Sequence, residues 1–580
     1  MNTITKKNNE KKYKNSTGYI IIYFGIISFL TFWFLSRNGY IYTGADAQFH
    51  INRLEELVSN YKLHNFFPFV STFSANRVGI GTNIFYPALW LVPFVFFRLI
   101  MQNPIHAIYA GLMLINFLTC IISFFTFKSF SKSRFKAFIF TNLYFFSTYR
   151  WIDILNRFDI SEFIALTIIP LVFWSFYETV YKDSRKWLWL AVSMALLLYA
   201  HILSFLIITC FLLIVFLVNF RQVPNIKQTF LSLSYSAFIF LLLTVRFLFT
   251  FIKTYLTSNI QSPRPFELSE TALSIGNLFH STLSNSIVGP SSGFNLGLIT
   301  FAILILVYRY FRYLPSLYKQ LTCWLAICLI FSTNLFPWLL LQNTGIAMIQ
   351  FPWRLFIIAN FLLNVIGAEI FSFVKIKNAT TYLVLTLMFL SLGSISQFVS
   401  VQQHDKTMNK AFIPYESLKK RYSIKINRKA YRYLTVTNPN KDYIPLNSKF
   451  TNNQNRHMYD QVVLQQMILY YKPVAIHQYK SIPNGIIWET PKIGRTTTVS
   501  MPFYIYQKHN YRVWVNDKRV KFNIDRYKLL KLKLGGTNNK VKIQYFPTLA
   551  QKSSIAISIF SFTFIALLGI NKWIAYIKKL

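Results

Sequence analysis

Acidic residues and cysteines are scarce in this chain of 580 residues. Its 19 aspartates and glutamates stand against 61 lysines and arginines, which gives a formal net charge of +42. The four cysteines form no CxxC pair and fall inside apolar stretches, which argues against a disulfide framework and against a cysteine metal site. The chain also lacks a GxxxxGK[ST] phosphate loop and any recognised nucleic-acid motif. We therefore expect no nucleic-acid partner.

Hydrophobic and aromatic residues are abundant instead, at 53% and 18% of the chain, and the mean hydropathy is +0.36. This composition is typical of a polytopic membrane protein, because a long apolar run can cross about 30 Å of hydrocarbon. The sequence predicts about 12 spans. They lie near residues 18–35, 104–127, 136–149, 162–180, 186–201, 203–220, 229–251, 296–311, 320–336, 353–373, 379–398 and 554–573.

The basic connectors between these spans predict the orientation. Lysines and arginines gather at 128–136, 182–186, 221–227, 309–319, 375–377 and 578–579. By the positive-inside rule these segments and both termini are cytoplasmic, in a multi-pass protein of the cell membrane. This topology requires that residues 85–101, interrupted by Pro87, Pro93 and Arg98, form a juxtamembrane helix that does not cross.

A large hydrophilic segment near the C-terminus differs in pattern from the rest. Apolar and polar residues alternate in Tyr511–Val520 around an Asn516-Asp517 turn, which favours a β-hairpin. The sequence therefore predicts a mainly α, polytopic transmembrane fold with a C-terminal extracytoplasmic β-rich sandwich domain. The expected parts are a cytoplasmic tail (1–16), a transmembrane domain (17–399) with an outer loop at 37–103, the extracellular β-rich domain (400–552), and a last span with a basic tail (553–580).

Three ionisable residues follow the first span. Asp46, His50 and Arg53 are spaced by four and three residues, which places them on one face of a helix. The carboxylate can serve as a general base, the imidazole can orient it or bind phosphate, and the guanidinium can contact phosphate. The alternatives are a helix-capping box from Thr43 to Asp46, a hydrogen-bonded interfacial histidine, and an arginine whose stem lies along lipid.

A dense charged turn follows the third span. It contains Arg157, Asp159 and Glu162, preceded by Arg150 and Asp153. Charge so close to two spans is costly unless it is paired or lines a wet cavity. The turn is either a second wall of an active site, or an internal salt-bridge network.

Two further basic residues are expected at the same outer level. His201 lies in the turn between two short spans, where it either faces the cleft or caps a helix. Arg354 follows Pro352 and Trp353 at the start of a span, where it either contacts a lipid phosphate or anchors the helix at the interface.

Several short motifs occur in a characteristic order. They are Gly44–His50, Asn83–Leu89, Asn156–Leu166, Tyr199–Ser204, Gln350–Leu355 and Asp442–Pro445. In this order they resemble the bacterial integral membrane proteins labelled 6-pyruvoyl-tetrahydropterin synthase-related. Those proteins are similar to the YfhO-like membrane proteins and belong to the wider GT-C glycosyltransferase superfamily. The resemblance spans nearly the whole chain, and nothing in the sequence resembles a soluble pterin enzyme.

The resemblance implies a GT-C-like fold that transfers a sugar from a polyprenyl-phosphate-linked donor to a cell-surface glycopolymer or lipid on the outer face. It implies catalytic roles for the acidic residues Asp46, Asp159 and Glu162. The expected substrate-binding residues are His50, Arg53, Arg157, His201 and Arg354. Because Asp-Ala-Gln stands where better-known members have Asp-x-Asp, we assign no metal ligand and leave the need for a divalent cation open.

The expected partners are membrane lipids, the polyprenyl-phosphate-linked sugar, and an anionic cell-wall polymer or lipid acceptor that the basic segment 400–552 binds. Two other functions stay open. One is a non-catalytic membrane scaffold for envelope assembly. The other is a lipid or polysaccharide transporter, which the lack of a nucleotide-binding motif and of an internal repeat of spans disfavours.

Overall fold

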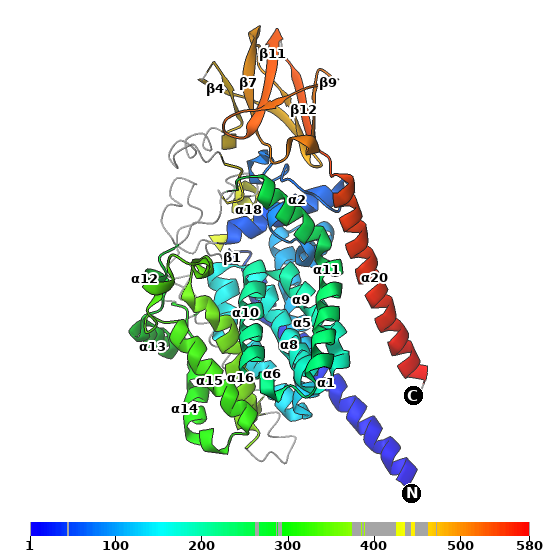
Figure 1. Cartoon of the computed structure of the whole chain (residues 1–580), viewed down its shortest axis with the longest axis vertical. Coiled ribbons are helices and arrows are strands. Elements are labelled where there is room, and N and C mark those ends of the chain that lie inside the picture. The colour runs from blue at the N-terminus through cyan, green and yellow to red at the C-terminus, as the bar shows by residue number, and fades with distance from the viewer. Residues whose placement is uncertain are drawn as a thin grey trace.

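The computed structural model has a helical bundle with a β-sandwich stacked on one end (Figure 1). It describes residues 2–42, 46–260, 266–285, 293–373, 425–434, 442–446, 462–470, 472–536 and 538–578, together with the single positions 287, 384, 385 and 388. The predicted fold class, mainly helical with a C-terminal β-rich domain, is confirmed.

Helices make up most of the bundle. Those of the N-terminal part are α1 Asn2–Arg37, α2 Ala47–Lys62, α3 Thr82–Phe85, α4 Val92–Ile100, α5 Pro104–Ser131, α6 Arg134–Phe145, α7 Thr148–Ile152, α8 Ile160–Tyr177, α9 Trp187–Ala200 and α10 Ile202–Val218. Those that follow are α11 Ile226–Thr257, α12 Leu268–Thr271, α13 Ile275–Ser284, α14 Leu298–Tyr310, α15 Ser316–Phe331, α16 Phe356–Phe371, α18 Arg428–Leu434 and α20 Leu549–Lys578. Sequence-encoded N-caps start several of them, since Asn103, Ser133 and Asn225 each accept a backbone N–H of the first turn.

Six helices in the described part of the chain are long and apolar enough to cross a membrane. They include α1, α5, α8, α11, α16 and α20. Five other predicted spans coincide with the shorter helices α6, α9, α10, α14 and α15. The remaining predicted span, 379–398, lies almost entirely outside the described residues. The bundle is therefore a membrane domain in which long spans are mixed with shorter helices packed against them.

The stretch 85–101 does not form a long helix. Its last part is the nine-residue helix α4, which packs against α2 and α5. One face of α4 is buried at Phe94 and Val95, whereas Phe96 and Ile100 are exposed. A nine-residue helix is too short to cross about 30 Å of hydrocarbon, and its position along the membrane surface stays a prediction.

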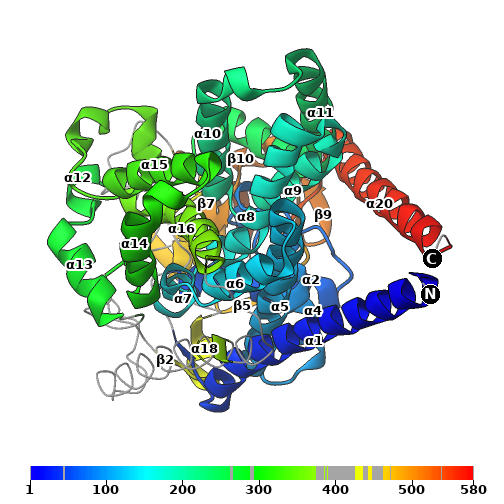
Figure 2. The same ribbon diagram turned by 90° about the horizontal axis from the view of Figure 1, so that it is seen from below.

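Both chain ends lie at the end of the bundle opposite the sandwich (Figure 1). Seen from that end, the outer tips of α1 and α20 project from the same side of the bundle (Figure 2). Consecutive helices run antiparallel, so the connectors α5–α6, α8–α9, α10–α11 and α14–α15 lie at this same end. We refer to it as the basic end, because four of the predicted basic connectors meet there.

The sandwich contains two antiparallel sheets of five strands each. Their orders are β10-β11-β7-β3-β4 and β5-β6-β12-β8-β9. The strands are β3 Gln466–Leu469, β4 Lys472–Ala475, β5 Gln478–Ile482, β6 Gly485–Glu489, β7 Gly494–Tyr504, β8 Tyr511–Val515, β9 Lys518–Val520, β10 Asn523–Ile524, β11 Leu529–Gly536 and β12 Lys540–Tyr545. The predicted hairpin around Asn516 and Asp517 joins β8 to β9. Alternate residues such as Val513, Val541 and Ile543 are buried between the sheets.

A two-stranded ribbon and a short helix attach the segment before the sandwich to the bundle. Strand β1, Ile41–Tyr42, pairs with β2, Lys425–Ile426, and α18 packs on α2 and α5. The Tyr431 hydroxyl donates to Glu55 at 2.7 Å, and Glu55 also pairs with Arg98 of α4 at 2.7 Å.

The sandwich shares a hydrophobic core with the loop that follows α2. Phe69, Val70 and Phe85 of this loop pack in one cluster with Trp488 and Phe503 of the sandwich. Polar contacts reinforce the junction, because the Asn484 side chain accepts from the backbone N–H groups of Phe69 and Val70. Helix α20 leads from the last strand back along α11.

Glu56 holds this loop on α2. Its carboxylate is fully buried and accepts the backbone N–H groups of Thr72, Phe73 and Ser74 at 2.8–3.0 Å. Asn60, one turn further along α2, donates to the same carboxylate at 2.9 Å. The sandwich therefore rests on a loop that a single buried carboxylate organises.

We predict that Glu56→Ala lowers the free energy of unfolding by about 3 kcal/mol, because several buried N–H donors lose a charged acceptor together. The measurement is the thermal melting of the purified protein in detergent micelles. Glu270→Ala, at an exposed position, is the control and should melt like the parent. Equal melting of the two variants would contradict this role of Glu56.

Candidate functional site

The predicted site residues come from four elements that meet beneath the sandwich. Asp46 precedes α2, and the π-helical turn Asp153–Arg157 precedes α8. The backbone N–H of Asp46 donates to the Arg157 carbonyl at 3.1 Å, which fixes the two segments side by side. Phe158 then turns the chain in a left-handed conformation, with φ of 59°, so that Asp159 can cap α8.

Four carboxylates converge on the guanidinium of Arg157. Its Nη1 lies 2.7 Å from Asp153 Oδ1 and 2.7 Å from Glu162 Oε2. Its Nη2 lies 3.0 Å from Asp159 Oδ2 and 3.4 Å from Asp46 Oδ2. We call this group, Arg157 with Asp46, Asp153, Asp159 and Glu162, the carboxylate cluster. The internal salt-bridge network that the sequence left as one alternative is thus present, and it includes Asp46.

Asp46 differs from the other three carboxylates in its exposure and its contacts. Its side chain is 39% exposed, whereas those of Asp153, Asp159 and Glu162 are 0%, 6% and 1% exposed. Its contact with Arg157 is the longest of the four. Although Asp46 occupies the N-cap position of α2, its side chain makes no capping hydrogen bond. Residues 43–45 of the expected capping box lie outside the described residues.

The electrostatic surroundings separate the carboxylates further. Although the Asp46 side chain is partly exposed, the surrounding protein removes much of the water around its carboxylate, which raises its pKa above the ordinary value against the lowering effect of the Arg157 charge. Burial and the nearby Glu162 raise the pKa of Asp153 well above the usual range. Burial also tends to raise the pKa of Asp159. A hydrogen bond from His50 and the charge of Arg157 outweigh this effect and hold the Asp159 pKa well below the usual range. Asp46 and Asp153 therefore bind protons more readily than Asp159.

His50 and Arg53 lie on the inner side of the cluster, on the face of α2 that the sequence predicted. His50 Nε2 lies 3.1 Å from Asp159 Oδ1. The Arg53 guanidinium donates to the Pro87 carbonyl and to the Ser161 hydroxyl, and it lies 4.2 Å from the Tyr86 ring centre. Both side chains are nearly fully buried, so they position neighbouring groups in this state.

Arg354 lies at the edge of the cluster, joined to it by an aromatic ring. The Trp353 ring centre is 5.0 Å from the Arg157 guanidinium and 5.9 Å from that of Arg354. Arg354 donates to the Ile349 carbonyl and to the Gln350 side chain, at 2.8 and 2.9 Å. Its Nε is buried and has no hydrogen-bond partner in the described part of the protein. The positive charge of Arg354 also lowers the pKa of Asp46, so the two side chains are close enough to interact electrostatically.

His201 serves as a helix cap. Its Nδ1 lies 2.7 Å from the Ser204 hydroxyl and accepts the Ser204 backbone N–H at the start of α10. Burial lowers the pKa of His201. Its ring is also 6.3 Å from that of Tyr86, so the cap borders the site. The capping alternative for His201 is the one that the structure supports.

Three carboxylates of the cluster have the composition of a metal site. Oxygens of Asp153, Asp159 and Glu162 lie within 4.8 Å of one another, and all three residues are buried. The Arg157 guanidinium, however, contacts the same three carboxylates at 2.7–3.0 Å. The positive charge that a divalent ion would bring is therefore already supplied by a side chain in this arrangement. A metal could bind these oxygens only if Arg157 moved away.

Several residues that the structure brings to the site were not among the predicted site residues. Asp153 is one, although it stands in the predicted charged turn, and Tyr149 donates to Glu162. Asp442 is another, because the segment 442–446 returns to the site, where Asp442 and Arg53 line a cavity of about 20 Å³. That volume holds about one water molecule. The i,i+4 spacing of Asp153 and Arg157 was the sequence signal that could have revealed their pairing.

Comparisons with known proteins leave the family unassigned. No protein-family model matches the chain, and no curated protein matches it significantly. Among solved structures, ArnT from Cupriavidus metallidurans, crystallised bound to undecaprenyl phosphate, is similar at 12% identity with a TM-score of 0.37. The match covers 65% of this chain and 63% of the ArnT chain, which is less than two thirds of that protein. A likeness this distant establishes neither a shared fold nor a shared activity.

We predict that Arg157→Gln destabilises the protein by about 3–5 kcal/mol, because it leaves buried carboxylates without their counter-charge. Arg185→Gln is the matched control, since Arg185 pairs with Asp183 on the surface and is 87% exposed. Its loss should leave the unfolding midpoint close to that of the parent, because an ion pair surrounded by water contributes little to stability. The measurement is the unfolding midpoint in detergent, and equal shifts for the two variants would contradict the assignment. Adding Asp153→Asn to Arg157→Gln should recover part of the loss.

Proposed function

We propose that this protein is a GT-C-type membrane glycosyltransferase. In this proposal it transfers a sugar from a polyprenyl-phosphate-linked donor to a cell-surface glycopolymer or lipid. The observation that carries the proposal is the position of Asp46: a partly exposed carboxylate with a raised pKa, at the edge of a buried ionic cluster and next to the bundle end that bears the sandwich. A reactive group is expected where a rigid charged network leaves one member accessible.

Asp46 would act as the general base. It would take the proton of an acceptor hydroxyl while the acceptor oxygen attacks the anomeric carbon of the donor sugar and the polyprenyl phosphate leaves. Among the described residues the Asp46 carboxylate has one side-chain contact, at 3.4 Å, so it is freer to accept a proton than Asp159, which accepts from two backbone N–H groups, His50 and Arg157. We therefore give Asp159 and Glu162 the role of holding Arg157 and the π-helical turn in place.

Arg354 is the better candidate for the donor phosphate. Its Nε is a buried donor with no partner in the described part of the chain, whereas both Nη atoms of Arg157 already contact carboxylates. A phosphate at Arg354 would complete its hydrogen bonds and stabilise the negative charge that develops on the leaving group. In this assignment Arg157, His50 and His201 support the site and do not bind the phosphate directly. Arg53, whose Nε is likewise a buried donor with no partner in the described part of the chain, is the second candidate for the phosphate.

The sandwich would bind the acceptor. Residues 462–546 hold 15 lysines and arginines and 3 acidic residues, a net charge of +12. Register pairs Lys542 with Trp514 and Trp514 with Arg519 across neighbouring strands, and the Lys542 ammonium lies 4.8 Å from the Trp514 ring centre. Aromatic rings flanked by cations suit an anionic glycopolymer. With both termini and the basic connectors at the other end, we infer that the sandwich is extracellular.

We predict that Asp46→Asn abolishes a surface sugar modification, with a loss of at least about 100-fold in transfer. Surface glycans of a deletion strain complemented with the parent or the variant, compared by mass spectrometry, provide the measurement. Asp517→Asn, at an 80% exposed carboxylate of the sandwich, is the control and should restore the modification. Membrane levels of both variants should equal that of the parent. Full modification with Asp46→Asn would favour the scaffold hypothesis, in which this carboxylate has no chemical role.

A pH dependence follows from the raised pKa of Asp46. A base works only when deprotonated, so transfer should fall as the pH drops through the Asp46 pKa, which lies above that of an ordinary aspartate. Sugar incorporation in isolated membranes, measured against pH, should show this acid limb. A residual rate of Asp46→Asn that follows the same limb would assign the titration to another group.

A further inference from the structure

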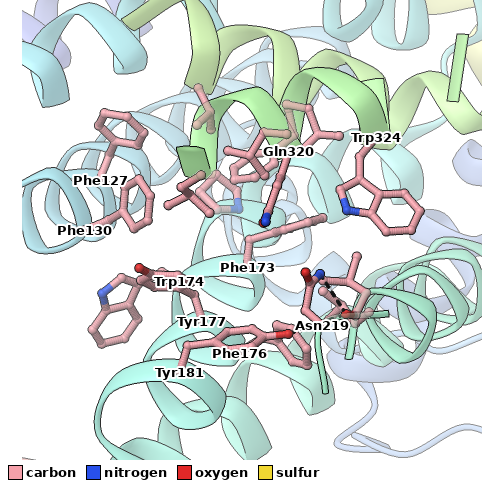
Figure 3. A pocket seen from close by; sticks show the side chains of 18 of the residues that line it. Phe127, Phe130, Phe173, Trp174, Phe176, Tyr177, Tyr181, Asn219, Gln320 and Trp324 are labelled. Carbon is pink, nitrogen blue, oxygen red and sulfur yellow. Dashed lines mark hydrogen bonds between the residues drawn. The ribbon is translucent and has the colours of Figure 1, made fainter. Parts of the chain in front are cut away.

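A second cavity lies in the membrane domain, far from the carboxylate cluster. It has a volume of about 330 Å³ and lies among α5, α8, α10, α15 and α16 (Figure 3). Its lining comes from the last turns of α5, α8 and α10 and the first turns of α15, which places it toward the basic end. The cluster, in contrast, lies at the first turn of α8. This cavity is in the size range of small-molecule and lipid sites.

Aromatic side chains from several helices contact one another in the wall of the cavity. Phe173 stacks on Phe361 with ring centres 4.3 Å apart and lies 5.8 Å from Phe211, which in turn contacts Trp324 at 5.6 Å. The four rings form a continuous layer contributed by four helices. Because this wall includes the last turns of α8 and the cluster lies at its first turn, the cavity is a separate site and not an extension of the carboxylate cluster.

The body of the cavity is apolar and its outer rim is polar. Phe127, Phe130, Phe176 and Tyr177 line the body (Figure 3). Lys182, Asn219, Gln222, Ser316 and Gln320 line the part next to the connectors. Lys182 is exposed, and its ammonium lies 5.6 Å from the Tyr177 ring centre, at the edge of the aromatic wall. Arg185, Arg221 and Lys319 stand in the same connectors and add positive charge.

The cavity is reached from the lipid-facing surface of the bundle. Val215, Gln320 and Trp324 of its lining are half-buried, and their neighbours Leu213 and Ile214 on α10 are exposed. The cavity thus lies in a seam between α10 and α15.

We propose that this cavity binds one anionic glycerophospholipid of the leaflet at the basic end. An acyl chain fills the aromatic body, and the phosphate lies at the rim beside Lys182. The apolar depth matches a hydrocarbon chain, and the rim matches a negative headgroup. The site holds a structural or regulatory lipid, and it is independent of the proposed sugar transfer.

The test uses the full-length protein, delipidated in detergent, with lipid binding measured by native mass spectrometry. The probes are phosphatidylglycerol, phosphatidylcholine of the same chains, and a polyprenyl phosphate. Val215→Trp should fill the cavity and weaken phosphatidylglycerol binding at least tenfold. Leu213→Trp is the matched control, because it adds the same side chain to the lipid-facing side of α10.

Lys182→Gln tests whether the lipid phosphate lies beside Lys182. This second variant also provides a test if Val215→Trp does not fold. It should weaken phosphatidylglycerol binding roughly fivefold and leave phosphatidylcholine binding unchanged. Lys227→Gln, an exposed lysine of the next connector, is its control. Equal binding by Val215→Trp and Leu213→Trp would overturn the site. Equal affinity of the parent for the two phospholipids, or a preference for polyprenyl phosphate, would overturn the assigned occupant.

Discussion

The attraction of one guanidinium for four carboxylates organises the end of the bundle that bears the sandwich. Arg157 is 11% exposed and contacts Asp46, Asp153, Asp159 and Glu162. Carboxylates this close together at a membrane edge repel one another when they are ionised, and a shared cation allows more of them to stay charged while buried. The start of α2, the π-helical turn and the first turn of α8 must therefore adopt positions that bring their carboxylates to Arg157.

The backbone around Arg157 is adapted to this requirement. A π-helical turn widens the last part of the α7 region, and Phe158 adopts a left-handed conformation between Arg157 and Asp159. These two features allow Asp159, only two positions after Arg157, to reach the Arg157 guanidinium. Unusual backbone geometry of this kind often accompanies functional sites, because the surrounding packing holds it in place. Here the buried rings of Phe158 and Tyr149 supply part of that packing.

The molecule separates two environments along the membrane normal. At one end, a loop anchored by Glu56 and the sandwich above it cover the carboxylate cluster. At the other end, an aromatic cavity opens among the basic connectors. The rings of Phe173, Phe211, Trp324 and Phe361 contact one another in the wall of this cavity. The carboxylate cluster and the aromatic cavity are thus separate sites. One bundle can bind a polar substrate at the first and a lipid chain at the second.

Local patterns in the sequence predicted most elements of the fold. Apolar runs located α5, α8, α11 and α20, and strict alternation located the β8–β9 hairpin with its Asn516-Asp517 turn. Prolines and a charge within 85–101 identified a segment that forms short helical pieces, the longest of them α4, and no long span. These signals are local, since helix and strand periodicity and turn chemistry depend on near neighbours. Which side of the membrane each end faces stays a prediction from the charge pattern.

The sequence by itself determined that this is a helical membrane protein with a basic β-rich domain, and that charged residues gather after the first and third spans. It did not decide whether Arg157 would be a free cation for phosphate or the centre of an ionic network. That depends on which carboxylates lie within 4 Å of it, and Asp46 is 111 positions away along the chain. Only the tertiary structure brought them together, because ionic contacts and burial depend on distances in space that no local pattern encodes.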